Sequence, residues 1–333
     1  MKNTIIDSNL HTPAETPAKP LRRARATACA TLAALLLTSL AAYAGNTDAC
    51  VATARYVYTA DLDSAHADFA IVVAKANDLP TEAERKAVRK QAVADLRDVQ
   101  DEAKARFRAR RDLCGNLGES RYNPVIDPAD FLAPEQIPTN LNRLYPLVPG
   151  TTFTYRSVEP TGTEIVTIKV THETRVILGV TCIVVRDTAR VDGAIIEDTV
   201  DWFAQDRAGN VWYFGENTAE YHGGLIVSID GGWEAGVNGA KPGIVMFAQP
   251  TVGKVYRQEL SYGEAEDAAK VLALDETVTL PSGNFTGCLK TEDFTPIEPD
   301  RVEHKYYAPG IGNVLTVNPG TGKRSELISA VKE

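Results

Sequence analysis

The sequence lacks the short motifs by which common enzyme classes are recognised. A Gly-x-Ser-x-Gly nucleophile turn, a Walker phosphate loop and a Gly-x-Gly-x-x-Gly dinucleotide loop are all missing from its 333 residues. His172-Glu173 begins like a zinc-protease helix, but Val176 stands where the second histidine is required. These absences disfavour the corresponding hydrolases and nucleotide-dependent enzymes. They lead us to expect no cofactor and no metal site, and they favour a binding protein over an enzyme without deciding between the two.

Cysteine is scarce, and its few positions point to a cellular compartment. None of the five cysteines forms a Cys-x-x-Cys pair, so zinc binding and thiol-redox chemistry are not expected. Cys29 lies in a predicted export signal, which leaves Cys50, Cys114, Cys182 and Cys288. This even number fits an oxidising compartment. Of the three possible pairings we favour Cys50 with Cys114 and Cys182 with Cys288, because one bridge then falls in each predicted domain.

Long apolar runs are also rare, and the clearest one lies near the N-terminus. The basic pair Arg22-Arg23 precedes the apolar run 26–40, and Ala42-Tyr43-Ala44 follows with small residues at the two positions that signal peptidase requires. This order predicts a signal peptide over residues 1–44 and a secreted or periplasmic location. The apolar run of roughly 15 residues is shorter than the 20 or so that a spanning helix needs. No stable membrane span is therefore expected after cleavage.

Positive charge is in short supply. The chain has 35 lysines and arginines against 44 aspartates and glutamates, a net charge of −9. Removal of residues 1–44 takes away five basic and two acidic residues, which leaves 30 against 42 and a net charge near −12. An acidic surface repels phosphate backbones and anionic lipid headgroups. Nucleic acid is therefore not expected as a partner.

Residues 45–115 carry the pattern of a helical hairpin. Apolar side chains recur at three- and four-residue steps from Val51 to Ala76 and again from Val88 to Phe107, as on one face of a helix. Thr81-Glu82-Ala83-Glu84 between them is a capping box, in which a hydroxyl and a carboxylate each satisfy a backbone N–H. Two antiparallel helices are predicted.

The end of the second predicted helix poses a problem of length. At about 1.5 Å per residue it is the longer of the two helices, so we expect it to stop or bend near Arg110 to let Cys114 reach Cys50. Four arginines gather at this end, namely Arg106, Arg108, Arg110 and Arg111. The helix dipole favours cations there, although the same cluster would also suit a docking arm for a protein partner.

The remainder of the chain predicts a connector and an all-β domain. Residues 116–150 hold six prolines and few periodic apolar positions, which predicts an extended connector over the surface. From residue 151 to 333 the period changes to two, as in the alternating 166–170 segment, and Asp192-Gly193 marks a tight hairpin turn. We expect an α+β fold: an N-terminal antiparallel helical hairpin, then an antiparallel meander of about ten strands in a half-barrel or a sandwich.

Several segments resemble a group of bacterial secreted proteins of uncharacterised activity. They fall within residues 120–330 and are Leu144–Phe153, Asp201–Asp206, Gly209–Glu216, Trp233–Gly236, Gly263–Asp267 and Lys305–Gly312. More loosely, a late Pro-x-Gly turn followed by Tyr-Ala-Pro-Gly-x-Gly is similar to exported half-barrel domains related to lipoprotein carriers. That looser resemblance implies a concave face able to hold an acyl chain, and neither resemblance implies a catalytic activity.

The candidate ligand site lies in the most aromatic part of the β domain. Aromatic rings beside carboxylates can form a platform for a sugar or an amphiphile. The candidate residues are Trp202, Trp212, Tyr213, Trp233, Asp201, Asp206, Glu216 and Glu234. The alternative is structural, because aromatic side chains pair across the strands of many hairpins.

A second acidic group surrounds Gly263. Glu259, Glu264, Glu266 and Asp267 could supply oxygen ligands to Ca²⁺, but their spacing matches no calcium loop. We expect a solvated acidic loop.

These patterns predict an exported, non-enzymatic binding or envelope-associated protein. Its expected partner is a hydrophobic or lipid-like small molecule, or an envelope component, held on the β domain. The alternative is a cell-envelope hydrolase that uses paired carboxylates near Trp202 and Trp212. In a third hypothesis the helical hairpin docks a protein partner.

Overall fold

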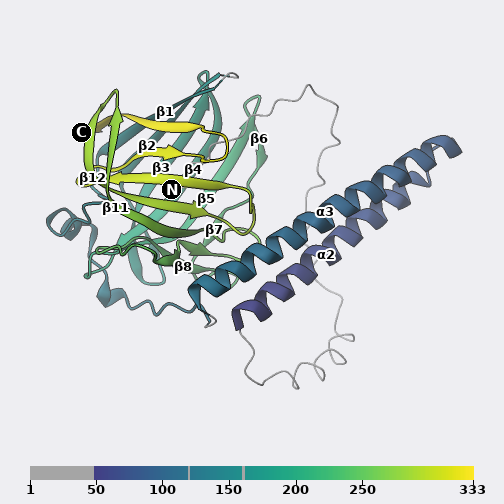
Figure 1. The fold of residues 1–333 in the computed structure, drawn as a ribbon, viewed down its shortest axis with the longest axis horizontal. Helices are drawn as coiled ribbons and strands as arrows, with labels where there is room; N and C mark the ends of the chain where they lie inside the picture. The colour runs from purple at the N-terminus through teal and green to yellow at the C-terminus, as the bar shows by residue number, and fades with distance from the viewer. Residues whose placement is uncertain (1–48, 119–120, 160–161) are drawn as a thin grey trace.

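The fold has two long helices followed by one large antiparallel sheet (Figure 1). This computed structural model describes residues 49–118, 121–159 and 162–333. The predicted signal peptide, residues 1–44, lies outside the described residues. The predicted α+β class, with an N-terminal helical pair and an antiparallel meander, is confirmed.

The two helices pack against each other through small side chains. Helix α2 spans Ala49–Ala76 and helix α3 spans Glu82–Leu117. The buried seam includes Ala54, Ala65, Ala76, Ala92 and Ala103. Because alanine removes little apolar surface from water, this seam contributes little stability. In Figure 1 the pair reaches away from the sheet, and one end of the pair lies beside the sheet.

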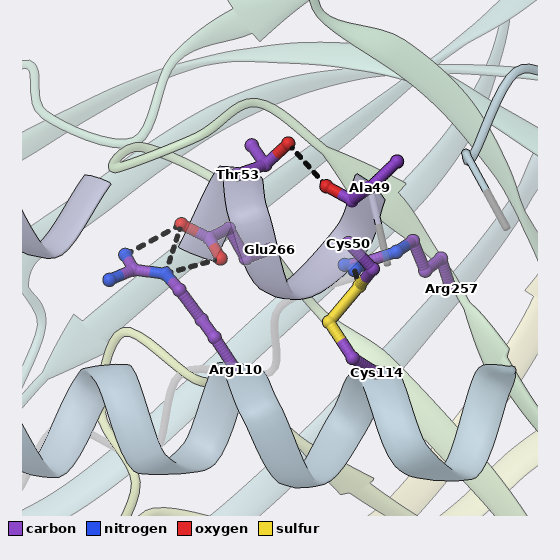
Figure 2. The surroundings of a disulfide bond; sticks show 7 residues. All are labelled: Ala49, Cys50, Thr53, Arg110, Cys114, Arg257 and Glu266. Atoms are coloured by element: carbon purple, nitrogen blue, oxygen red, sulfur yellow. Dashed lines mark hydrogen bonds and ion pairs between the residues drawn. A yellow bond between two sulfur atoms is a disulfide. The ribbon is translucent and has the colours of Figure 1, made fainter. Parts of the chain in front are cut away.

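A disulfide joins the helices at the end that lies beside the sheet. Cys50 in the first turn of α2 is bonded to Cys114 near the end of α3, with the two Cα atoms 5.7 Å apart (Figure 2). This confirms the first predicted bridge. The bonded residues are 64 positions apart, and closing a loop of that length stabilises the folded state by about 4 kcal/mol in the chain-entropy model.

Helix α3 does not stop near Arg110 as expected, but continues through Cys114 to Leu117. The turn between the helices makes up the difference in length between α2 and α3. Arg85 donates to the carbonyl oxygen of Leu79 and Arg89 donates to the side chain of Asn77. These turn residues therefore lie along the first turns of α3, and the predicted capping box of Thr81 and Glu84 is present.

The described part of the β domain forms a single sheet of fifteen strands. The strands are β1 Thr151–Glu159, β2 Gly162–Ile177, β3 Val180–Val191, β4 Ala194–Gln205, β5 Val211–His222, β6 Leu225–Ser228, β7 Trp233–Glu234, β8 Lys241–Met246, β9 Val255–Arg257, β10 Glu259–Leu260, β11 Ala268–Leu280, β12 Gly283–Phe294, β13 Val302–Ala308, β14 Gly312–Val317 and β15 Arg324–Lys332. Their order is β10-β8-β5-β4-β3-β2-β1-β15-β14-β13-β12-β11-β9, and β6 and β7 pair with β5. All the pairings are antiparallel, as predicted.

The sheet curls until its two edges lie side by side. Arg257 of β9 pairs with β11, whereas Glu259 of β10 pairs with β8, so a single residue, Gln258, connects the two edge strands. Gly243 of β8 permits this approach, because a Cβ there would collide with the backbone of Arg257 and Gln258. The architecture is therefore one curled, open sheet, and not the two packed sheets of a sandwich.

The second predicted bridge, Cys182 with Cys288, is wrong, since both residues are buried free thiols. Five strands separate β3, which carries Cys182, from β12, which carries Cys288. Burial raises the pKa of both thiols; Glu234 adds to this effect at Cys182 and Glu276 at Cys288.

The proline-rich connector closes one end of the curled sheet. It contains two short 3₁₀ helices, Pro128–Asp130 and Pro134–Thr139. Ile137 and Leu147 are almost fully buried in the same core as the strands. Leu132 donates its backbone N–H to Gln205 at the end of β4. The connector is therefore part of the core, and more than the surface segment expected from its composition.

The interior of the sheet changes from apolar to polar between its two ends. On one face of β4, alternate residues change from the buried Phe203 to the polar Asp201 and Thr199. On β13 they change in the same way from the buried Tyr307 to Lys305 and Glu303. The apolar side chains face the connector. The polar end is the one away from the connector.

One buried ion pair attaches the helices to the β domain. The guanidinium group of Arg110 donates to both oxygens of Glu266 at 2.7 to 3.1 Å, and both side chains are at most 4% exposed. Asp61 lies 3.5 Å from the same guanidinium group. The expected solvated acidic loop is thus wrong for Glu266, and also for Glu259, which is 1% exposed.

Mass spectrometry of peptides alkylated before reduction tests the cysteine assignments. We expect the unfolded, unreduced protein to carry the alkyl label at Cys182 and Cys288, because both thiols are free in the structure. Cys50 and Cys114 should be labelled only after reduction. A peptide that links Cys182 to Cys288 would contradict the structure.

The Arg110–Glu266 pair should behave as a coupled unit. Glu266→Ala leaves a buried guanidinium group without its main partner, so the free energy of unfolding should fall by about 3–5 kcal/mol. Adding Arg110→Leu removes the stranded charge and should restore part of this loss. Urea unfolding followed by circular dichroism measures the free energy of unfolding of the single and the double variant. A double variant that is no more stable than Glu266→Ala would contradict the coupling.

Candidate functional site

A cleft of about 260 Å³ opens at the polar end of the interior. Strands β4 and β5 supply one wall and β12 and β13 supply the other, although these pairs lie far apart in the strand order. The curl of the sheet brings them together. The lining residues are Glu197, Glu216, Thr218, Glu220, Asp230, Gly231, Gly263, Glu264, Asp267, Asp293, Phe294, Thr295, Ile297, Glu298, Arg301, Glu303 and Lys305.

Carboxylates dominate this cleft. Nine of its described lining residues are aspartate or glutamate, against the two cations Arg301 and Lys305. Glu216, Asp293 and Glu303 are less than a tenth exposed, whereas Glu220, Glu264 and Glu298 are exposed at the mouth. Like charges on facing walls raise one another's energy unless a cation lies between them. The cleft therefore has a strongly negative potential.

Lys305 lies at the base of the cleft between two carboxylates. Its Nζ atom is 3.3 Å from Asp293 and 3.5 Å from Glu303. Burial alone would lower the pKa of Lys305, but the coulombic attraction of Asp293 and Glu303 outweighs it and raises that pKa. Burial raises the pKa of Glu303, although Lys305 and Arg301 oppose the change. Lys305 therefore stays charged, and it partly neutralises the inner carboxylates.

Asp187 of β3 is a buried carboxyl group behind this wall. Burial raises its pKa well above the usual value, and the nearby Asp201 and Glu197 raise it further. Its backbone pairs with Thr199 of β4, two residues from Asp201. The protonated form is therefore favoured over a wider pH range than in an exposed aspartate.

Four of the eight predicted site residues lie together in the interior. Asp201 and Glu216 are directly opposite each other on β4 and β5. The hydroxyl group of Tyr213 donates to Asp201 at 2.6 Å, and the ring of Trp233 packs edge-on to Tyr213 at 5.4 Å. The indole N–H of Trp233 donates to Glu259 at 2.8 Å. Of these four residues, only Glu216 lines the acidic cleft.

The other four form two separate structural clusters. Arg175 lies over the ring of Trp202 at 4.3 Å and forms an ion pair with Glu234. Trp212 donates its indole N–H to Asp206 at 2.9 Å, within the β4–β5 turn. The structure therefore does not gather the eight residues into one platform.

Sequence reasoning missed the far wall of the cleft. Within 302–308, Glu303 and Lys305 alternate with Val302 and His304, so both faces of the strand carry polar groups and the pattern does not say which face is buried. No short motif marks this wall. This wall could have been predicted only if β13 had been known to face β4 across the interior.

The apolar part of the interior is filled by its own side chains. Two spaces beside Tyr145 and Tyr307 measure about 20 Å³ each, which is room for about one water molecule. Ligand clefts typically measure about 300–1,000 Å³. Among the described residues this region thus offers no space for an acyl chain.

Two further kinds of feature, a metal-binding cluster and a membrane-spanning helix, are absent from the described residues. Residues 49–118, 121–159 and 162–333 contain no group of three or more histidine, cysteine, aspartate or glutamate side chains arranged to hold a metal ion. Neither described helix is both long and apolar enough to cross a membrane.

Asp187→Asn tests the buried carboxyl group. Because the folded pKa is raised, the native state binds more protons than the unfolded state above the unfolded pKa, so stability falls as pH rises from about 4 through the folded pKa. The variant removes this dependence and should raise the free energy of unfolding at pH 8 by about 1–3 kcal/mol, with little gain at pH 3.5. Urea unfolding at both pH values is the measurement; an equal effect at both would contradict the raised pKa.

Comparisons with known proteins give a limited result. No family model and no curated protein matches the sequence. One crystal structure, of a protein from Parabacteroides distasonis provisionally described as a lipoprotein, is similar over 56% of this chain and 98% of its own, with a TM-score of 0.31 and 12% identity. This likeness is too weak to support an argument. The resemblance of residues 120–330 to bacterial secreted proteins stays a prediction.

Proposed function

We propose that this is an exported binding protein that holds a small organic cation, such as an amine, in the acidic cleft. The carrying observation is that nine carboxylates converge from opposite walls of a cleft of about 260 Å³. A volume near the lower end of the usual range for ligand sites suits a small molecule. The proposed site lies on the β domain, where a ligand site was expected, but the proposed ligand is a cation and not a lipid-like molecule.

The arrangement of charges supports an organic cation. The two cations of the cleft have carboxylate partners close by: Arg301 is 2.9 Å from Glu298, and Lys305 lies between Asp293 and Glu303. Even with both counted, the lining carries seven more negative than positive groups at neutral pH when all its carboxyl groups are ionised. An amine or guanidinium group can donate to several carboxylates at once.

The geometry gives less support to the other ligand and to the hydrolase. A lipid-like ligand needs apolar space, and the apolar cavities measure about 20 Å³ each. A glycosidase needs two carboxyl groups on either side of one bond. Of the four carboxylates among the predicted site residues, Glu216 lines the cleft and Asp201 accepts a hydrogen bond from Tyr213 in the interior. Asp206 and Glu234 belong to the two tryptophan clusters.

The disulfide supports the proposed export of the protein. The Cys50–Cys114 bond is compatible with an extracytoplasmic location, where such bonds persist. The cation could belong to a component of the cell envelope. A protein partner that binds the projecting helices is a separate prediction.

Isothermal titration calorimetry with spermidine tests the proposal. We expect the full chain to bind spermidine at low salt, because a trivalent amine can contact both carboxylate walls. A variant that combines Glu220→Gln, Glu264→Gln and Glu298→Gln at the mouth should bind at least about tenfold more weakly, which corresponds to about 1.4 kcal/mol.

The matched control removes three exposed carboxylates elsewhere, by Glu102→Gln, Glu135→Gln and Glu173→Gln. It changes net charge by the same amount, so its affinity should stay within about threefold of the original. No binding by the unmodified chain, or equal weakening in both triple variants, would refute the cleft as the site.

A further inference from the structure

A second cavity, of about 700 Å³, lies where the helical pair meets the β domain. Its walls come from the first turns of α2, the end of α3, residues 121–124, and strands β8 to β10 with the loop that follows. The lining residues are Ala49, Cys50, Ala52, Thr53, Tyr56, Leu117, Gly118, Arg121, Tyr122, Asn123, Pro124, Lys241, Arg257, Leu260 and Tyr262. Among these described residues three are cationic and none is acidic, in a chain whose net charge is −9.

Arg257 is the unusual member of this lining. Its side chain is 6% exposed, and neither Nε nor Nη1 has a hydrogen-bond partner among the described residues. Its Nη2 atom lies 4.0 Å from the sulfur of Cys50, which is a weak acceptor (Figure 2). Burial lowers the pKa of this guanidinium group. Among the described residues this buried cation has no counter-ion, and such a group is expensive unless a partner binds it.

Glu266, the carboxylate that raises the pKa of Arg257 through space, is already engaged in other hydrogen bonds. Glu266 accepts hydrogen bonds from Arg110 at 2.7 to 3.1 Å and from the backbone N–H of Gly263 at 2.9 Å. Figure 2 shows Arg110 and Glu266 joined on one side of the disulfide and Arg257 on the other. Glu266 acts on the pKa of Arg257 only through space, and the positive charge of Arg110 opposes it.

The remaining walls are aromatic and apolar. The guanidinium group of Arg257 lies 5.9 Å from the centre of the Tyr122 ring, and Tyr122 donates its hydroxyl to the carbonyl oxygen of Pro242. Burial raises the pKa of Tyr122 to about 12, so its hydroxyl is neutral at physiological pH. Lys241 donates to the carbonyl oxygen of Tyr122 and to Asn123, which fixes this wall. Tyr56 and Tyr262 add two more rings.

We infer that this cavity binds an organic anion whose oxyanion, a carboxylate or a phosphate, contacts Arg257 while its apolar or aromatic body lies against the tyrosine rings. A guanidinium group forms strong, charge-assisted hydrogen bonds with such anions. The volume is far larger than an inorganic ion requires, and the rings and Leu260 supply the apolar surface. The site is opposite in charge to the acidic cleft and does not depend on it.

Isothermal titration calorimetry of the full chain with benzoate, phenyl phosphate, inorganic phosphate and neutral benzyl alcohol tests this inference. We expect benzoate or phenyl phosphate to bind at least tenfold more tightly than inorganic phosphate and benzyl alcohol. Arg257→Leu should weaken that binding at least tenfold, and Arg257→Lys should weaken it less. The control Arg175→Leu removes an arginine that pairs with Glu234 outside the cavity and should leave the affinity unchanged.

A measurement without ligand separates binding from a structural role. Because Arg257→Leu removes a buried charge that lacks a partner, its melting temperature without ligand should equal or exceed that of the unmodified chain, whereas a structural arginine would cost stability. Benzoate or phenyl phosphate should raise the melting temperature of the unmodified chain and not that of the variant.

Two results would overturn the inference. One is equal affinity for the anions in the unmodified chain and in Arg257→Leu. The other is anion binding by Glu119→Gln but not by the unmodified chain, which would make Glu119, a residue outside the described ranges, the counter-ion of Arg257. Anion binding by the unmodified chain that Glu119→Gln leaves in place supports the inference.

Discussion

The whole structure depends on the need of one long sheet to bury one of its faces. A flat sheet of fifteen strands would leave both faces in water, and the two helices of the described residues cover neither face, because α2 and α3 mostly pack on each other. The sheet covers its inner face by curling onto itself, as the natural twist of strands allows. Gly243 lets the two edges meet beside Gln258. The curl then decides which residues face each other across the interior.

The interior has two ends with different chemistry. Aromatic side chains and the proline-rich connector fill the end that carries Phe203 and Tyr145, whose ring centres lie 5.6 Å apart with the rings tilted at 53°. The other end collects Asp187, Asp293 and Glu303, whose burial costs free energy that the apolar end must offset. Charged groups kept inside at such a cost are typical of functional sites. This cost supports the proposed ligand site in the acidic cleft.

The sequence was informative wherever structure is decided locally. The capping box at Thr81, the hairpin turn at Asp192-Gly193 and the alternation in β2 each depend on a few neighbouring residues, and each was predicted correctly. The Cys50–Cys114 bridge could be predicted because a hairpin brings its two ends together. The Cys182–Cys288 pairing failed because it depended on how far the sheet curls, which no local pattern records.

The sites show the same limit. Asp201 and Glu216 could be expected side by side because they flank a single hairpin, whereas Glu303 and Lys305 come from a strand much later in the chain, and the sequence shows no periodic sign of their burial. Arg110 and Glu266 looked like unrelated charge clusters, and their pairing became visible only once the helices were placed against the sheet.

That pairing also explains how one acidic protein can hold a basic cavity. The alanine seam of the helices buries little, so the disulfide holds the two helices together and Arg110–Glu266 holds the pair against the β domain. Arg110 engages Glu266, the carboxylate that acts on Arg257 through space, and the described residues that line the cavity beside Arg257 include no acid. The contact that docks the helices therefore also creates the positive potential beside them. Sites of opposite charge can then persist in one chain, because the acidic cleft lies inside the sheet and the basic cavity lies at its junction with the helices.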